Sequence, residues 1–418
     1  MLRYLLGRIG YGLLVLWGVV TVVFFLFNLS PGDPVRNLVG ENAPQEVVDN
    51  IRRKLDLDLP LGVRYVYYLN DLSPLSIYAN AGSDSRLQWV PEAHGGVKLF
   101  PLGARHQLIL KTPFLRRSFL SDRSVSDILA EAMPGTFVLA VVSISLALII
   151  GLLLGVYAAL HKDSPTDQLI LFISALGMAG PSFFVAIIVA WIGAVLWRDT
   201  IAIPLWPLMV LVIGWVLVRF REKTGIRISS TLMWLSTAAI FVLCLIFPRG
   251  GWNVFLTLPG TGLNMTGSLY SVNAFDGSYL DLRNLILPAI TLAIRPLAVI
   301  VQLTRSSILD VLTQDYIRTA RAKGLPERTV IFRHALRNAL NPVITAVSGW
   351  FASLLAGAVF VEFVFGWKGL GQELFLAIEK QDMPVVMGGV ILIAALFVGI
   401  SMLVDVAYGW IDPRVRKV

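Results

Sequence analysis

The feature that most constrains this chain is a series of eight long apolar segments within its 418 residues. A helix that crosses a bilayer needs about 20 mainly apolar residues, and it satisfies its own backbone hydrogen bonds there. Seven segments hold no charged residue, and the sixth holds only Arg295. They predict an all-α, polytopic helical bundle with about eight transmembrane helices. The expected spans are residues 9–29, 132–160, 168–197, 200–218, 228–248, 284–304, 338–361 and 383–404.

The composition excludes several other classes of protein. Only 15% of the residues are charged and 56% are hydrophobic, whereas a soluble domain carries about 25% charged residues. A soluble enzyme, a disordered protein and a nucleic-acid binder are therefore not expected, in spite of the net charge of +8. The single Cys244 excludes an intrachain disulfide, and the four histidines show no metal-ligand spacing, so no metal site is expected.

The placement of Lys and Arg predicts the orientation. With the N-terminus inside, the expected cytoplasmic segments hold 17 of the 35 basic residues, and seven of these lie in 305–337. The loop 30–127 is nearly neutral, with 12 basic and 11 acidic residues. The apolar run 9–29 is longer than the about 7–15 residues of a signal-peptide core, so it is expected to be retained. We therefore expect a multi-pass protein of the bacterial plasma (inner) membrane with both termini in the cytoplasm.

Three regions follow from these spans. Residues 1–29 form an N-terminal transmembrane helix, 30–131 form a large extracytoplasmic loop region, and 132–418 form the main transmembrane domain. Two stretches of the main domain stand out: an extra apolar hairpin at 200–248 and a long cytoplasmic loop at 305–342.

The loop 305–342 has a helical pattern. Apolar residues recur at steps of three and four from 307 onward, and small and basic residues continue the helix to 323. Gly324 is a typical helix stop, and Pro326 suits the first turn of a second helix that reaches Asn341-Pro342. This predicts a helix–turn–helix at the membrane surface. The simpler interpretation, in which the basic residues only anchor the chain or contact lipid, stays open at this point.

The residues of this loop resemble a known family. Residues 318–324, Arg-Thr-Ala-Arg-Ala-Lys-Gly, resemble the "EAA" loop of binding-protein-dependent ABC importer permeases. Residues 315–325 and 333–340 are similar to the dipeptide/oligopeptide/nickel branch, and the chain resembles its first permease subunit. Further motifs typical of that branch are Pro31-Gly32-Asp33-Pro34, Asp127-Ile128-Leu129, Pro134-Gly135-Thr136, Gly155-Val156 and Asp412-Pro413-Arg414.

The resemblance implies a permease subunit of an ATP-driven importer for peptides or similar small solutes. It implies four kinds of partner: a second homologous permease, two cytoplasmic ATP-binding subunits, an extracytoplasmic substrate-binding protein and the lipid bilayer. The loop would form a coupling helix against an ATPase subunit, with Arg318, Thr319, Ala320, Arg321 and Gly324 at the contact. The chain has no Gly-Lys-Ser/Thr phosphate-binding motif, so ATP would be used by the partner subunits and this chain would hold no cofactor.

The chain also departs from that family. The branch has six spans, so the hairpin 200–248 would be an insertion. The general family pattern has an acidic residue and then Ala where this chain has Arg318 and Thr319. The outer loop 30–127 is longer than usual, and it would contact the binding protein or cap the pore entrance.

Arg295 is the charged residue that lies deep in an expected span. A charge at that depth costs about 2.5–3.5 kcal/mol or more, so it should face the bundle interior or a wet cavity. It would either line the pathway or pair structurally with a carboxylate or backbone carbonyls.

The alternative function, an ion-gradient-driven secondary transporter or channel, would favour carboxylates at mid-depth, which the spans lack. We find no nucleophile–base pair either, so the chain is not expected to be an enzyme.

Overall fold

The computed structural model describes residues 2–29, 34–40, 43–79, 89, 95–102, 106–204, 255–273, 277–355 and 358–411. They belong to two compact units. The first comprises residues 1–187 and 266–418, and the second comprises residues 188–265. Each unit is described by itself below.

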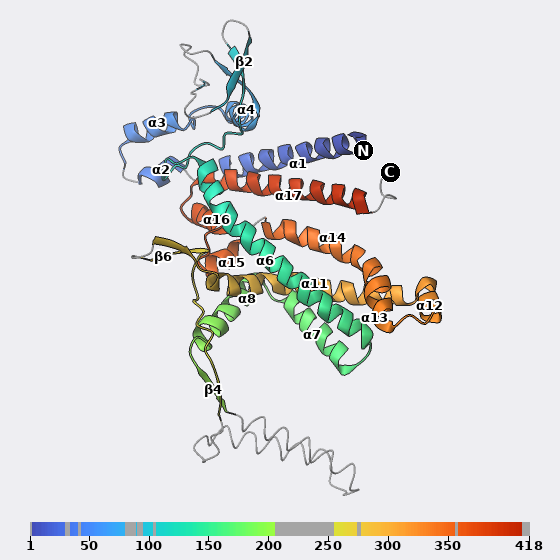
Figure 1. Cartoon of the computed structure of the whole chain (residues 1–418). Coiled ribbons are helices and arrows are strands. Elements are labelled where there is room, and N and C mark those ends of the chain that lie inside the picture. Colours follow the sequence, from blue (N-terminus) through green and yellow to red (C-terminus); the bar gives the residue numbers. More distant parts are fainter. Residues whose placement is uncertain are drawn as a thin grey trace. The chain divides into compact units, whose positions relative to one another are not determined.

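The first unit is a bundle of long helices (Figure 1). Four helices of the described chain are long and apolar enough to cross a membrane: α1 (Leu2–Asn28), α6 (Val125–Leu160), α11 (Arg283–Leu312) and α17 (Met383–Ile411). α1 packs along α17, and α6 packs along α11. The predicted polytopic helical bundle is therefore confirmed. Within its described residues this unit also holds two small antiparallel sheets, which the sequence did not indicate.

α6 and α11 approach each other closely because glycines lie between them. Gly151 and Gly155 are one helical turn apart on α6 and are buried against α11. A Cβ at Gly155 would lie 2.6 Å from Cβ of Thr304, and one at Gly151 would lie 2.7 Å from a methyl carbon of Ile300. Small residues four apart allow this close backbone packing between membrane helices. α6 and α11 thus form the centre of the bundle.

The expected single span 168–197 is wrong in one respect, because it is broken at Gly180-Pro181. The structure has α7 (Pro165–Ala179) and α8 (Ser182–Ala190) with a bend of 109° between the two helical stretches. Gly180 is extended, with ψ 136°. Proline lacks an N–H and disfavours the helical conformation of the residue before it, which explains the break.

The expected span 338–361 is not one helix either. α14 (Leu336–Leu355) is followed by a separate short helix, α15 (Val359–Val364). α14 packs against α6, α11 and α17, but it is not among the four helices that are long and apolar enough to cross a membrane. Its first two turns carry Asn338, Asn341 and Pro342, which lower its hydropathy.

α15 and α16 (Leu370–Glu379) form a hairpin that is fastened to α6 by a buried carboxylate. The fully buried Glu362 accepts hydrogen bonds from the backbone N–H groups of Gly371 at 2.7 Å and Gln372 at 3.1 Å. The Thr136 hydroxyl on α6 donates to Oε1 of Glu362 at 2.9 Å. Glu362 therefore caps the first turn of α16, whose free N–H groups need such acceptors.

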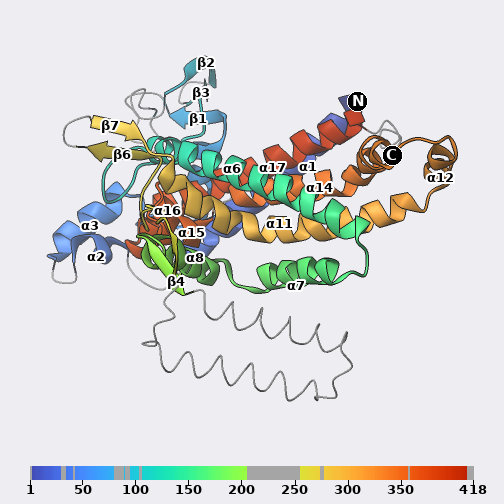
Figure 2. The same ribbon diagram turned by 60° about the horizontal axis from the view of Figure 1, so that its bottom comes forward.

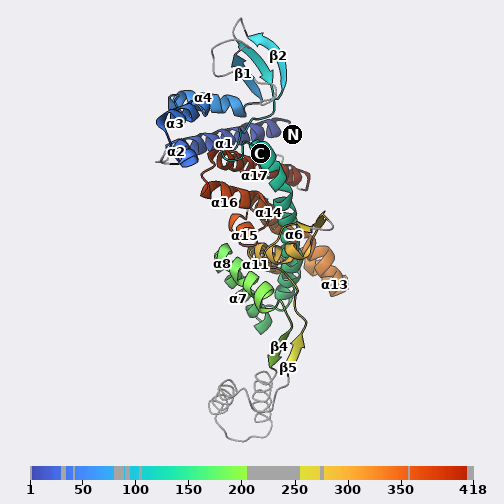
Figure 3. The same ribbon diagram turned by 90° about the vertical axis from the view of Figure 1, so that its left-hand side faces the viewer.

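The region expected to be an external loop is a folded layer. It contains α2 (Pro34–Val39), α3 (Gln45–Lys54), α4 (Leu61–Leu72) and the strands β1 (Leu75–Ala79), β2 (Val97–Leu102) and β3 (His106–Leu110), in the sheet order β1-β3-β2. α4 lies between this sheet and α1 (Figure 3). Tyr65 and Tyr68 of α4 pack against Phe24 of α1. The loop region ends earlier than expected, because α6 begins at Val125 rather than 132.

The second unit is described only at its two ends. α8 continues into the π-helical segment η1 (Trp191–Leu196), and β4 (Ile201–Pro204) pairs antiparallel with β5 (Phe255–Leu258). The first residues of the expected span 200–218 are thus a strand, since they pair with β5. The rest of the predicted hairpin 200–248 lies outside the described residues. A third sheet, β6 (Tyr270–Asn273) with β7 (Gly277–Leu280), belongs to the first unit.

Candidate functional site

The predicted loop 305–342 contains two helical arms joined by a turn. α11 extends to Leu312, and α12 (Asp315–Ala322) forms the first arm. The second arm begins with α13 (Glu327–Thr329) and a π-helical segment, η2 (Val330–Ala335). It does not end at Asn341-Pro342 as expected, but continues into α14. A proline inside a membrane helix is tolerated where packing stabilises the helix.

α12 is amphipathic, and its apolar side rests on the second arm. Ile317 is fully buried, and Ala320 is buried as well. They form a cluster with Val330 and Ala335 of η2 and with the end of α11. The opposite side of α12 is exposed, and so is every residue from Arg321 to Arg328. The arms thus present a polar surface on a well-packed apolar base.

Gly324 closes α12 in a Schellman motif. Its N–H donates to the Arg321 carbonyl at 2.9 Å, and the Leu325 N–H donates to the Ala320 carbonyl at 3.4 Å. Gly324 has φ +75°, a left-handed conformation that glycine adopts without strain. No atom lies within 4 Å of the place where a Cβ would be, so backbone conformation rather than space selects glycine here.

An ion pair bridges the turn. The Arg321 guanidinium donates to Glu327 Oε1 at 2.6 Å, with both side chains about half exposed. This hydrogen bond lowers the pKa of Glu327 and raises the pKa of Arg321. The ion pair orients the two arms at their exposed end.

Arg318 and Thr319 remain at the surface of α12. The Arg318 guanidinium is 3.7 Å from Asp315, and these two side chains are 75% and 97% exposed. So exposed a pair contributes little and leaves the guanidinium available to another protein. The Thr319 hydroxyl donates to the Asp315 carbonyl at 3.0 Å. The structure therefore brings four of the five predicted contact residues to the surface, and Ala320 supports them from below.

The segment is firmly joined to the bundle. Ile308 and Ile331 pack with Ala339 against Val156 and Ala159 of α6. The Asn338 amide donates to the Tyr316 hydroxyl at 2.8 Å and links the two arms. These contacts connect α12 through the second arm to α6, α11 and α14.

Sequence reasoning missed one ion pair at this end of the bundle. Arg305 donates to both carboxylate oxygens of Asp167, each at 2.6 Å. The Asp167 side chain is 1% exposed and that of Arg305 is 19% exposed. Asp167 also accepts the Asp163 N–H at 2.9 Å, and its own N–H is capped by Ser164. The only signal in the sequence is the helix start Ser164-Pro165, because the two partners are 138 residues apart.

Arg295 is exposed on the otherwise well-covered helix α11. In the most apolar stretch of α11, 67% of the residues are buried, whereas the corresponding shares of α1, α6 and α17 are 22%, 33% and 28%. Among the residues that the structure describes, no ion pair or hydrogen bond involves the Arg295 side chain. Arg295 thus marks a face of α11 that this single chain leaves uncovered.

Comparison with known proteins decides the family. Residues 151–417 match the family described as the inner membrane component of binding-protein-dependent transport systems, and residues 1–84 match its N-terminal companion. The chain belongs to this family. It is 33% identical to the di/tripeptide transport system permease protein DppB of Pseudomonas aeruginosa, over 100% of this chain and 99% of that protein. It is 29% identical to the dipeptide transport system permease protein DppB of Alkalihalophilus pseudofirmus, over 100% of both chains.

Family membership confirms several expectations. The chain is a multi-pass inner-membrane permease of an ABC importer, which works with a binding protein, and the family is one of transport proteins rather than enzymes. The alternative of a gradient-driven transporter or channel is not supported.

Proposed function

We propose that this permease imports peptides or similar small solutes, with energy from ATP that is hydrolysed by two cytoplasmic partner subunits. A second homologous permease would complete the pathway, and an external binding protein would deliver the substrate. The peptide specificity is supported by the names of full-length relatives, which are peptide permeases.

The observation that carries the energy coupling is the exposed turn Arg321–Arg328 on its buried base. Eight consecutive exposed residues project from two helices that are packed onto α6 and α11. Such an element is suited to docking in a groove of an ATPase subunit. Movement of the ATPases would then shift a two-state bundle through α12.

The proposed docking of α12 also implies how the chain is oriented in the membrane. The N-terminal end of α1 and the C-terminal end of α17 lie at the end that carries α12 (Figure 2). If α12 meets cytoplasmic ATPases, both termini are cytoplasmic. The folded layer α2–α4 with β1–β3 lies at the other end of the first unit and would face the binding protein.

Arg295 is a candidate pathway residue in this proposal. Its exposure supports a role at the face of α11 that the second permease would cover or the substrate would pass. An unpaired guanidinium there would attract the carboxylate of a peptide.

The proposed function is tested in proteoliposomes that contain this chain, the second permease, both ATPase subunits and the binding protein. We expect uptake of a labelled dipeptide that requires ATP and the binding protein and is unaffected when the ion gradient is collapsed. A labelled nickel chelate serves as the competing cargo. Dipeptide uptake without ATP, or uptake of the chelate alone, would refute the proposal.

A further inference from the structure

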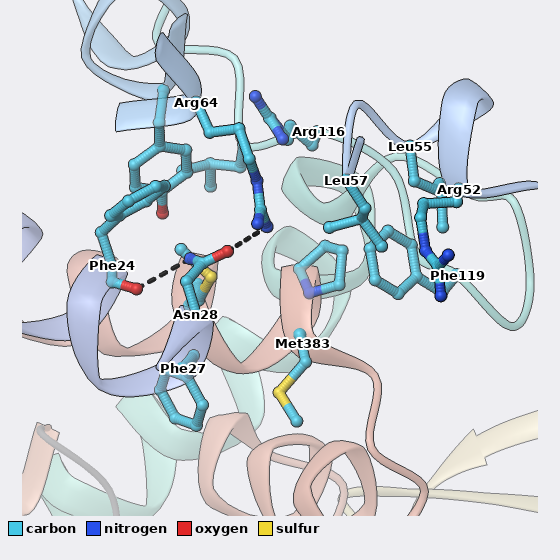
Figure 4. Close-up of a pocket in the computed structure, with 14 residues that line it drawn as sticks. Phe24, Phe27, Asn28, Arg52, Leu55, Leu57, Arg64, Arg116, Phe119 and Met383 are labelled. Atoms are coloured by element: carbon cyan, nitrogen blue, oxygen red, sulfur yellow. Dashed lines mark hydrogen bonds between the residues drawn. The ribbon is translucent and has the colours of Figure 1, made fainter. Parts of the chain in front are cut away.

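A cavity lies at the end of the bundle that carries the folded layer. It has a volume of about 540 Å³ and opens where α1 ends and α17 begins (Figure 4). Its floor is formed by Phe24 and Phe27 of α1 and by Met383 and Met387 of α17. Leu57 and Phe119 of the folded layer contribute apolar walls.

Three arginines line the same cavity: Arg52, Arg64 and Arg116. None of its fourteen lining residues is acidic. Arg52 is 3.4 Å from Asp49, and Arg116 is 3.0 Å from Asp71; both carboxylates lie outside the lining. The cavity therefore combines an apolar floor with a positively charged rim.

Arg64 is the cation held nearest to the floor. From α4 it donates to the amide oxygen of Asn28, whose own nitrogen donates to the Phe24 carbonyl at 2.7 Å. Its partner in this contact is thus a neutral amide rather than a carboxylate. Burial lowers the pKa of Arg64 most, and the neighbouring Arg116 lowers it further, while the Asp56 carboxylate offsets part of this decrease. A bound anion would relieve both effects, because it would pair with the half-buried charge.

The cavity coincides with the edge of the expected bilayer. The apolar stretches Gly7–Asn28 and Met383–Val404 both terminate at its floor. The four floor side chains are therefore at the depth of acyl chains, and the arginines are at the depth of headgroups. A ligand that fills both parts needs an anionic head and an apolar tail.

We propose that this cavity binds an acidic phospholipid, with its phosphate at Arg64, Arg52 and Arg116 and an acyl chain against Phe27 and Met383. Arg64 and Arg116 hold the phosphate by charge-assisted hydrogen bonds, and the apolar floor excludes free inorganic phosphate as the full ligand. The lipid joins the folded layer to the ends of α1 and α17.

The test uses the assembled transporter in nanodiscs that contain a photoactivatable phosphatidylglycerol, and the cross-linked peptides are mapped. We expect cross-links on residues 24–28 and 383–387. Arg64→Gln should reduce them about tenfold, because it removes a charge-assisted contact. Arg64→Lys should retain most of them. The matched control is Arg53→Gln on α3, since Arg53 is exposed and outside the cavity. If Arg64→Gln does not fold, Leu57→Glu places a repelling carboxylate on the wall instead.

Four results would overturn the proposal. The first is cross-linking of the test variant, Arg64→Gln or its substitute Leu57→Glu, that equals the cross-linking of the control Arg53→Gln. The second is equal labelling by a photoactivatable phosphatidylcholine. The third is displacement by inorganic phosphate alone, which would indicate a phosphate site. The fourth is displacement by dipeptide at its transport concentration, which would indicate a substrate site.

Discussion

Arg305, two turns before the end of α11, donates two hydrogen bonds of 2.6 Å to the carboxylate of Asp167 in the first turn of α7. The pair fixes α7 to α11 beside the segment that we expect to couple to ATPases. Because the Asp167 carboxylate is 1% exposed, its removal would leave a partly buried, uncompensated guanidinium.

We therefore predict that Asp167→Asn destabilises the permease by about 3 kcal/mol, the scale found when one partner of a buried pair is removed. The measurement is thermal unfolding of the purified transporter. The matched control is Asp315→Asn, which removes the carboxylate of an exposed Asp–Arg pair and should leave the unfolding temperature unchanged. Equal effects of the two substitutions would show that the Asp167 pair is not structural.

Substitutions of Gly324 separate backbone strain from contact with a partner. A Cβ at 324 would have no atom of the described chain within 4 Å, so we attribute steric effects beyond strain to another protein. Gly324→Asn tolerates the left-handed conformation and should retain most ATP-driven uptake, whereas Gly324→Phe should abolish it and leave ATP hydrolysis uncoupled. Uptake and ATP hydrolysis are measured in the same proteoliposomes, with membrane insertion as the control. Full uptake by Gly324→Phe contradicts a docking role for this turn.

The Arg321–Glu327 ion pair gives the turn a pH dependence. Since Arg321 lowers the pKa of Glu327, the stabilisation is complete above the ordinary glutamate pKa of about 4.5 and is lost as the pH falls through the lowered value. A fluorophore on Leu325→Cys, in a chain with Cys244→Ser, reports the mobility of the turn. We expect constant anisotropy from pH 7 to about 5 and a decrease below about 4.

Glu327→Gln is the control for this titration. It removes the titrating group, so the label should be more mobile at pH 7 and show no acid transition. An identical acid transition in Glu327→Gln would assign the titration to another group.

Substitutions of Arg295 test whether the uncovered face of α11 lines the transport pathway. Arg295→Leu should lower peptide uptake at least about tenfold and leave the thermal stability of the isolated chain unchanged, because the described structure shows no ion pair for Arg295. Arg295→Lys should restore part of the uptake. Uptake and the unfolding temperature together separate a pathway role from a structural one. If Arg295 formed a structural pair, Arg295→Leu would lower the unfolding temperature.

The sequence predicted features that depend on local chemistry. Gly324 ends α12 and Pro326 precedes the next arm, because both effects act through φ/ψ preferences of the residue itself. The same chemistry at Gly180-Pro181 was present in the sequence, but the continuous apolar run around it favoured one span. The fold of residues 43–79 and 95–102 could not be predicted, since its helices and sheet depend on distant packing such as Tyr68 on Phe24.

Contacts between segments that are distant in the sequence could not be predicted either. Asp167 and Arg305 each looked like an ordinary charge beside a membrane helix, and their partnership depends on the packing of α7 against α11. The sequence of 305–342 was enough to predict which surface residues of α12 are candidates for contact. The burial of Ala320 and the cluster around it became visible only in the structure. The family resemblance predicted that α12 docks on an ATPase subunit, and the structure adds the buried cluster through which α12 contacts the bundle.

The central claim is that the α12 turn docks on an ATPase subunit, and site-directed cross-linking tests it most directly. Thr319→Cys, in a chain with Cys244→Ser, is placed in the assembled transporter together with a cysteine-reactive photoprobe. The control is Leu120→Cys, an exposed position in the loop before α6, at the other end of α6 from α12. The account predicts that Thr319→Cys cross-links to an ATPase subunit with a yield that changes on addition of ATP, and that Leu120→Cys does not. Failure of Thr319→Cys to cross-link in a complex that still transports peptide would contradict it.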